Sequence, residues 1–205
     1  MSEVWDRIYK SDTAFFGQEA SNFALLCYDD MKVQNVKRIL ELGAGHGRDS
    51  VFFASNGIEV EALDYSVVAV KVLENLARES TLAIKTQVFD VKNIFPFSDS
   101  YFDAVYSHML LNMRFTFGEL RFIFSEIRRV LKIKGLNYFS VRNHNDKFYG
   151  KGIEIEDGIY DIDGFHVRFF TEEEIRELAS SFEVLWIREE YEEPVTLYFV
   201  STRKV

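Results

Sequence analysis

The sequence predicts an α/β fold, a Rossmann-like, doubly wound, three-layer αβα arrangement around a seven-stranded, mostly parallel sheet with a C-terminal antiparallel strand. Two observations predict it. Apolar segments with strand character alternate with segments of helical periodicity between residues 39 and 141. In addition, the apolar pair Ile39-Leu40 leads into the glycine-rich stretch Gly43-Ala44-Gly45-His46-Gly47, and a helical segment follows. A strand, a glycine turn and a helix form a nucleotide-binding βαβ unit.

Composition narrows the class of protein before any motif is considered. The chain has 205 residues, 47% of them hydrophobic and 28% charged, which is ordinary for a soluble domain. The net charge is −9, and the one basic cluster, Arg128 to Lys134, follows a helix, where cations complement the helix dipole. A nucleic-acid substrate is therefore disfavoured. No apolar run approaches the roughly 20 residues of a membrane span.

Cysteine, histidine and the N-terminal residues exclude further classes. A single cysteine, Cys27, rules out a disulfide framework and a paired-cysteine metal knuckle. The four histidines are not spaced as a metal site, so no metal is predicted. Because the start of the chain lacks a basic segment followed by an apolar core, we expect a cytoplasmic protein.

The N-terminal residues 4–33 are predicted to be helical in two pieces, split near residues 15–17. The second piece places Phe23, Leu26, Cys27 and Met31 on one face, the spacing of a packed helix. Cys27 is therefore interpreted as a small core residue and not as a nucleophile.

The spacing of the glycine turn bears on which nucleotide it would hold. The dinucleotide pattern needs a third glycine where this chain has Arg48, and an acid, Glu41, precedes the turn instead. A carboxylate on the strand side of the turn suits a ligand with an ammonium or sulfonium group. The next strand, Ile58 to Leu63, ends on Asp64, which can accept hydrogen bonds from ribose hydroxyls.

The next elements place a third acid at a strand end. A helix capped by Ser66 runs to about Glu79, and a strand over residues 83–89 ends at Asp90. Since the carboxyl ends of parallel strands meet at the ligand crevice, Glu41, Asp64 and Asp90 are expected to lie close together.

The C-terminal half is predicted from capping boxes and apolar runs. A fourth strand covers residues 101–107, and Thr116 with Glu119 opens a helix that runs to about Leu131. A fifth strand, 136–141, is followed by a long polar insertion without regular structure. Thr171 with Glu174 opens the last helix, and two strands, 183–190 and 195–202, form the closing antiparallel pair.

These motifs together resemble the class I S-adenosylmethionine-dependent methyltransferases. The resemblance rests on Glu41-x-Gly43-x-Gly45-x-Gly47, on the acids after strands two and three, and on a turn at 131–135 that departs from the family's Leu-Lys-Pro-Gly-Gly at two positions. Residues 39–64 are most similar to the small-molecule branch, namely the tellurite-resistance methyltransferases and methyltransferase type 11 and 25 domains. Ser107-His108-Met109-Leu110 replaces the Asn/Asp-Pro-Pro-Tyr motif of enzymes that methylate adenine N6 or glutamine, which argues against both substrates.

The resemblance implies S-adenosylmethionine as cofactor and S-adenosylhomocysteine as product. The residues expected to contact it are Tyr9, Glu41, Gly43, Ala44, Gly45, Gly47, Arg48, Asp64, Tyr65, Asp90, Val91 and Ser107. In the family, a tyrosine of the N-terminal segment can close over the methionine end of the cofactor. Tyr9 is the candidate here, with simple packing of a surface helix as an equal alternative.

No catalytic residue is certain, because the sulfonium is already an activated methyl donor and catalysis is mainly alignment. The candidates for a base or an acceptor anchor are His108, Arg142, His144 and Tyr149. A turn cap for His108 and solvated loop positions for Arg142 and His144 are the alternatives.

The sequence thus predicts in-line methyl transfer to a small-molecule acceptor, with a non-catalytic cofactor-binding or interaction module as the alternative. Arg48 disfavours a dehydrogenase, a protein substrate is less favoured, and no membrane partner is expected. One domain is predicted over residues 1–205. Its parts are an N-terminal helical cap (1–35), a cofactor-binding core (36–141), a substrate-side insertion (142–168) and a C-terminal helix with a strand pair (169–205).

Overall fold

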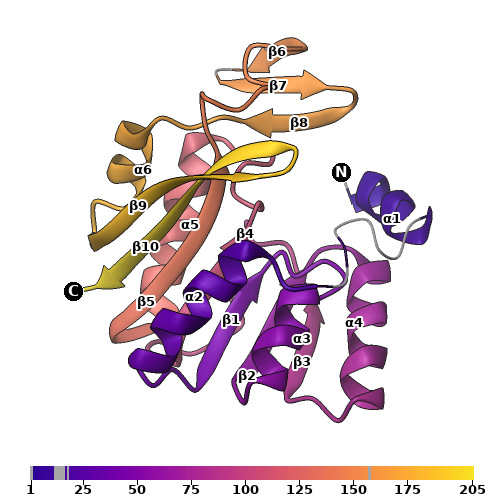
Figure 1. Cartoon of the computed structure of the whole chain (residues 1–205), viewed down its shortest axis with the longest axis vertical. Helices are drawn as coiled ribbons and strands as arrows, with labels where there is room; N and C mark the ends of the chain where they lie inside the picture. The colour runs from indigo at the N-terminus through magenta and orange to yellow at the C-terminus, as the bar shows by residue number, and fades with distance from the viewer. Residues whose placement is uncertain (1, 12–16, 18, 157) are drawn as a thin grey trace. The chain divides into compact units, whose positions relative to one another are not determined.

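The computed structural model describes residues 2–11, 17, 19–156 and 158–205 (Figure 1). The chain divides into two compact units. We call Met1–Pro96 with Phe102–Tyr106 unit 1, and Phe97–Tyr101 with Ser107–Val205 unit 2. The single domain with four segments stays a prediction.

Unit 1 contains parallel strands. They are β1 (Arg38–Leu42), β2 (Glu59–Asp64), β3 (Ile84–Val88) and β4 (Phe102–His108) as far as Tyr106. β1 pairs in parallel with β2 and β4, and β2 pairs in parallel with β3. Leu42 is opposite Leu63 in this register, so the residues that follow β1 lie next to the end of β2.

The described residues of unit 1 include the helices α1 (Ser2–Ser11), α2 (Asn22–Val33), α3 (Arg48–Ser55) and α4 (Val67–Glu79). Ser21 caps α2 and Ser66 caps α4, each by accepting a backbone N–H of the first turn. Cys27 is fully buried on α2, as its spacing indicated. Most of the predicted split near residues 15–17 lies outside the described residues.

Unit 2 contains α5 (Phe117–Val130), β5 (Leu131–Arg142), α6 (Glu172–Leu178), β9 (Phe182–Glu192) and β10 (Val195–Lys204). Both predicted capping boxes are present, Thr116 with Glu119 on α5 and Thr171 with Glu174 on α6. β10 runs antiparallel to both β5 and β9, which confirms the predicted closing pair.

The fifth strand begins earlier than the sequence predicted. We expected a turn over residues 131–135 and a strand from 136, whereas β5 starts at Leu131, directly after α5. Lys134 adopts a φ of 64°, and pairing with β10 begins only at Leu136. The backbone therefore bends within an extended segment. The turn that we predicted from the sequence of residues 131–135 was wrong.

The insertion after β5 has regular structure of its own, contrary to our prediction. β6 (Ile153–Glu156), β7 (Ile159–Ile162) and β8 (Phe165–Arg168) form a separate antiparallel sheet, drawn in orange in Figure 1. The loop between β7 and β8 consists of Asp163 and Gly164, both with positive φ. An Asp-Gly pair between two apolar-alternating runs is a strong hairpin signal, which we overlooked.

The strand order across the chain is β3-β2-β1-β4-β5-β10-β9. The predicted fold class is confirmed: a seven-stranded sheet ends in an antiparallel strand pair and is accompanied by helices. Within the described part of the chain, no helix is both long and apolar enough to cross a membrane.

Candidate functional site

The glycine turn of unit 1 joins β1 to α3 and is held in one conformation. The Gly43 N–H donates to the Leu63 carbonyl at 2.8 Å, which fixes the turn to the end of β2. Gly45 and Gly47 have φ angles of 56° and 84°, a region that favours glycine. A Cβ on Gly47 would lie 2.2 Å from a methyl carbon of Leu73, so a larger residue there would require Leu73 to shift.

Asp64 connects this turn to the start of α4. Its Oδ2 accepts the Gly45 N–H and its Oδ1 accepts the Ser66 N–H, both at 2.8 Å. The side chain is buried, and burial raises the pKa of its carboxyl group. A carboxylate has about four lone-pair sites, so these two bonds leave capacity for hydroxyl donors of a ligand.

Glu41, the acid before the turn, is buried on β1. Its carboxylate accepts a hydrogen bond from the Ser50 hydroxyl. Burial, and then the charge of Asp49, raise the pKa of Glu41 well above its ordinary value. A buried carboxylate of this kind favours a nearby positive charge.

Asp49, in the first turn of α3, was not among the predicted site residues. It accepts the backbone N–H and the hydroxyl of Ser21 at 2.8 Å each, and the hydroxyl of Tyr106 at 2.7 Å. The Arg48 guanidinium lies 3.8 Å from Asp49 Oδ1. Asp49 thereby ties the start of α2 and the strand β4 to the glycine turn, although its partners are far apart in sequence.

Tyr9, on α1, lies against the glycine turn. Its ring centroid is 4.5 Å from that of His46, and a Cβ on Gly45 would lie 2.9 Å from its hydroxyl. The side chain is 6% exposed. Burial, and then the charge of Asp64, raise the pKa of the phenol. The position agrees with a side chain that closes over the turn, and the lid role stays a prediction.

The residues that follow β2 and β3 differ in exposure. Asp90 is exposed, and its Oδ1 accepts the Lys92 N–H at 3.0 Å. Tyr65 is half-buried, and burial followed by the charges of Asp64 and Asp90 raises the pKa of its hydroxyl. Val91 is buried. The remaining half-buried members of the predicted set are Gly43, Ala44 and Arg48.

Two predicted residues lie at the end of β4, in unit 2. The His108 Nδ1 is 2.7 Å from the Ser140 hydroxyl, and its Nε2 is 3.5 Å from Glu192 Oε1. This hydroxyl, imidazole and carboxylate are arranged like a nucleophile relay, but Ser140 is fully buried and also accepts the Met109 N–H. It therefore cannot reach a substrate. Ser107 is buried, and no described residue is within hydrogen-bonding distance of its hydroxyl.

Arg142, predicted as an acceptor anchor, is engaged inside unit 2. Its Nε and a terminal nitrogen donate to the two carboxylate oxygens of Asp146 at 2.9 and 2.8 Å. The guanidinium carbon lies 5.0 Å from the ring centroids of both Phe148 and Phe169. Because this group is buried and binds both carboxylate oxygens of Asp146, the structure favours a structural role for Arg142.

His144 and Tyr149 are exposed and stack on each other, with ring centroids 4.1 Å apart and planes 12° apart. Tyr149 also contacts Tyr160 and Phe169 at 5.9 and 5.5 Å. The two candidates therefore form one aromatic surface on the insertion, to which Tyr160 adds a residue that the sequence analysis missed.

Comparison with known proteins assigns this arrangement to a family. Residues 39–135, which span the glycine turn and all three acids, match a family described as methyltransferase domain. This match and the similarity to solved S-adenosylmethionine-dependent methyltransferases support a class I S-adenosylmethionine-dependent methyltransferase. No match to the sequence was found among curated proteins.

Solved structures agree with this assignment. A protein from Methanosarcina mazei, described among S-adenosylmethionine-dependent methyltransferases, is 25% identical, with a TM-score of 0.75 over 85% of this chain and 97% of that one. The 1,6-didemethyltoxoflavin N1-methyltransferase of Burkholderia thailandensis, solved with bound S-adenosylhomocysteine, is 20% identical, with a TM-score of 0.66 over 85% and 74%. The [4+2]-cyclase SpnF is 17% identical, with a TM-score of 0.74 over 99% and 95%.

The methyltransferase-domain match and the similarity to S-adenosylmethionine-dependent methyltransferases support S-adenosylmethionine as the cofactor. The likeness to SpnF concerns the fold alone. It illustrates that this fold is also found in a protein described as a cyclase, so that the fold by itself does not identify the acceptor.

Proposed function

We propose that the protein transfers the methyl group of S-adenosylmethionine to a small-molecule acceptor by in-line displacement, with S-adenosylhomocysteine as product. The observation that carries this proposal is the glycine turn between two buried carboxylates, Glu41 and Asp64. The glycines admit a ligand close to the backbone. The carboxylates favour a ligand that is positively charged.

The charge of the turn fits this cofactor better than it fits a pyrophosphate. Burial raises the pKa of both Glu41 and Asp64, which means that ionising them inside unit 1 costs free energy. A ligand with an ammonium and a sulfonium group offsets that cost, whereas a dianionic pyrophosphate adds to it. When bound, the cofactor supplies a methyl group on an activated sulfur.

The proposed contacts follow from where polar groups remain available. Asp64 and the exposed Asp90 would receive the hydroxyl and amino donors of the adenosine part. Glu41 would act through its charge, because its side chain is buried. Tyr9 would exclude water from the turn, and the high pKa of its phenol keeps it neutral while it does so.

The acceptor is best sought among nucleophiles that need no strong base. The Nδ1 of His108 is hydrogen-bonded to Ser140 and its Nε2 lies 3.5 Å from Glu192 Oε1, so His108 is better suited to holding these residues in place than to removing a proton. Small thiols and chalcogen oxyanions meet this condition. The exposed stack of His144 and Tyr149 is the proposed contact surface for such an acceptor.

The experiment is an isothermal titration of the full chain with S-adenosylmethionine, S-adenosylhomocysteine and NAD, followed by assays of S-adenosylhomocysteine formation with a thiol and oxyanion panel. We expect micromolar binding of both adenosyl ligands, no binding of NAD, and turnover with at least one acceptor. Binding without turnover on any acceptor would favour the alternative, a non-catalytic module. Binding of NAD instead would refute the assignment of the turn.

A further inference from the structure

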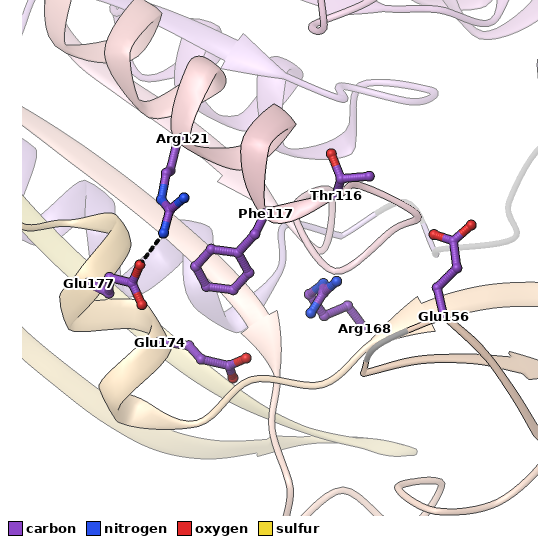
Figure 2. A pocket seen from close by; sticks show the side chains of 7 residues that line it. All are labelled: Thr116, Phe117, Arg121, Glu156, Arg168, Glu174 and Glu177. Carbon is purple, nitrogen blue, oxygen red and sulfur yellow. Dashed lines mark hydrogen bonds and ion pairs between the residues drawn. The ribbon is translucent and has the colours of Figure 1, made fainter.

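Unit 2 contains a cavity of about 370 Å³ that the proposed cofactor site does not use (Figure 2). It is lined by Thr116, Phe117, Arg121, Glu156, Arg168, Glu174 and Glu177, which come from α5, α6, β6 and β8. This volume falls at the small end of the range typical for small-molecule sites, about 300 to 1,000 Å³. The cavity therefore suits a ligand of the size of an amino acid.

Arg168 is the residue that sets the character of this cavity. Only 5% of it is exposed, and its Nε is buried without a hydrogen-bond partner. Its guanidinium carbon lies 5.6 Å from the ring centroid of Phe117, and Figure 2 shows the two side chains next to each other. No carboxylate of the described residues forms an ion pair with it. A buried charge without a counter-charge is costly, so this position favours an anionic ligand group.

The acids of the cavity wall restrict which anions fit. Glu177 pairs with Arg121, and Glu156 pairs with Arg114, so two of the three are neutralised by arginines. Glu174 has no arginine partner among the described residues, and its Oε2 accepts the Thr171 N–H at 2.8 Å. A polyanion would be repelled by this wall, whereas a ligand with one carboxylate and one ammonium group matches both Arg168 and Glu174.

We propose that this cavity binds a small zwitterion, an α-amino acid or a compound of that class, with Arg168 receiving the carboxylate and Glu174 the ammonium group. Arginine suits the first role because its planar fork matches a carboxylate in two parallel hydrogen bonds. The proposal does not rest on methyl transfer, since binding is measured without cofactor. It assigns a class of ligand to unit 2, and it holds whether that ligand accepts the methyl group or regulates the protein.

The experiment titrates the full chain, in the absence of S-adenosylmethionine, with the standard α-amino acids and with the N-acetyl and carboxamide derivatives of whichever binds best. We expect at least one free amino acid to bind, and both derivatives to bind about tenfold more weakly or worse, because each lacks one of the two charges. Failure of every free amino acid to bind at millimolar concentration overturns the proposal. Equal binding of the derivatives does so too.

Variants separate a ligand role from a structural one. Arg168→Met keeps the apolar stem and should weaken binding about tenfold or more, since a charge-assisted pair is lost. Glu174→Gln keeps the capping box, because glutamine also serves there, and should weaken only ligands that carry an ammonium group. Arg188→Met, at an exposed position, is the control and should bind as the parent does.

One result would contradict the role assigned to Arg168. Undiminished binding by Arg168→Met would show that the arginine only supports Phe117. If Arg168→Met does not fold, Glu174→Gln and the derivatives of the parent titration still decide the proposal. Unchanged cofactor binding in all three variants is expected, so a failure here and a failure of the methyltransferase assignment remain distinguishable.

Discussion

The glycine turn of unit 1 and the cavity of unit 2 both bury charge, but of opposite sign. Around the turn, Glu41 and Asp64 are buried and receive their hydrogen bonds from a hydroxyl and from backbone N–H groups. In the cavity, Arg168 is buried beside an aromatic ring. The comparison teaches that a buried charge indicates which ligand group its site favours: a positively charged group at the turn and, for Arg168 as proposed above, a carboxylate in the cavity.

The two regions also differ in how their parts are distributed along the chain. The turn, its preceding acid and Asp64 fall within residues 41–64, whereas the cavity gathers side chains from residue 116 to residue 177. The first region was therefore open to recognition from sequence, and the second was not.

The largest expected effect is a difference in stability between variants of two buried arginines of unit 2. Arg142 is paired with Asp146, and removing one partner of a buried ion pair typically costs about 3 to 5 kcal/mol. We expect Arg142→Met to lose about that much stability in chemical denaturation. Arg168→Met should lose little or gain stability, because it removes a buried charge that lacks a counter-charge. Equal losses of stability for the two variants would contradict the distinction between a paired and an unpaired arginine.

The next effect concerns two glycines with the same backbone conformation. Gly47 and Gly57 both have a φ of 84°, but only a Cβ on Gly47 meets a neighbour, at 2.2 Å from Leu73. Gly57→Ala should cost about 1 to 2 kcal/mol from the left-handed conformation. Gly47→Ala should cost a further 1 to 3 kcal/mol or so from overpacking. Urea unfolding of both variants measures the difference, and similar values would mean that Leu73 moves aside freely.

A smaller effect is expected for cofactor binding at Asp64. Asp64→Ala should weaken S-adenosylmethionine binding by about 1.5 to 3 kcal/mol, the value of a hydrogen bond to a charged group, or roughly 10- to 150-fold in Kd. Isothermal titration measures it, with Asp99→Ala as control, since Asp99 is an exposed carboxylate in an ion pair of unit 2. Parent-like affinity of Asp64→Ala would refute the proposed ribose contact.

The smallest effect is a pH dependence at Glu41. The pKa of Glu41 is raised in the folded state, so the folded chain binds this proton more tightly than the unfolded chain does. The stability of the parent therefore rises as pH falls through the folded-state pKa. Glu41→Gln cannot ionise and should lack this slope. We expect the variant to exceed the parent in melting temperature at neutral pH, with the advantage shrinking towards acid pH. A parent without this slope would mean that Glu41 is not a costly charge.

The sequence predicted those features that are determined locally. The turn between β1 and α3 and both capping boxes follow from spacing within a few residues, and each is present where expected. The contacts of Asp49 could not be predicted, because Ser21 and Tyr106 lie 28 and 57 residues away and meet it only once β4 and α2 are in place.

The errors in unit 2 had two different causes. The small sheet of the insertion had a local signal, the Asp163-Gly164 pair. We missed this signal because we interpreted the segment as a polar loop. The pairing of Arg142 with Asp146 had none, because a loop without helical periodicity gives no reason to expect contact four residues along the chain. Charged residues at a strand end therefore belong to the candidate site in unit 1 and, in the case of Arg142, to a buried ion pair in unit 2.

Tyr9 has a consequence for the timing of the reaction. Its ring packs against His46 and its hydroxyl lies close to Gly45, so in the proposed lid role a ligand seated on the turn leaves only after α1 has moved. Loop and helix opening of this kind takes microseconds to milliseconds, and in many enzymes such opening limits turnover. We therefore expect the dissociation rate of S-adenosylhomocysteine, and with it the steady-state rate, to be set by ten residues at the start of the chain.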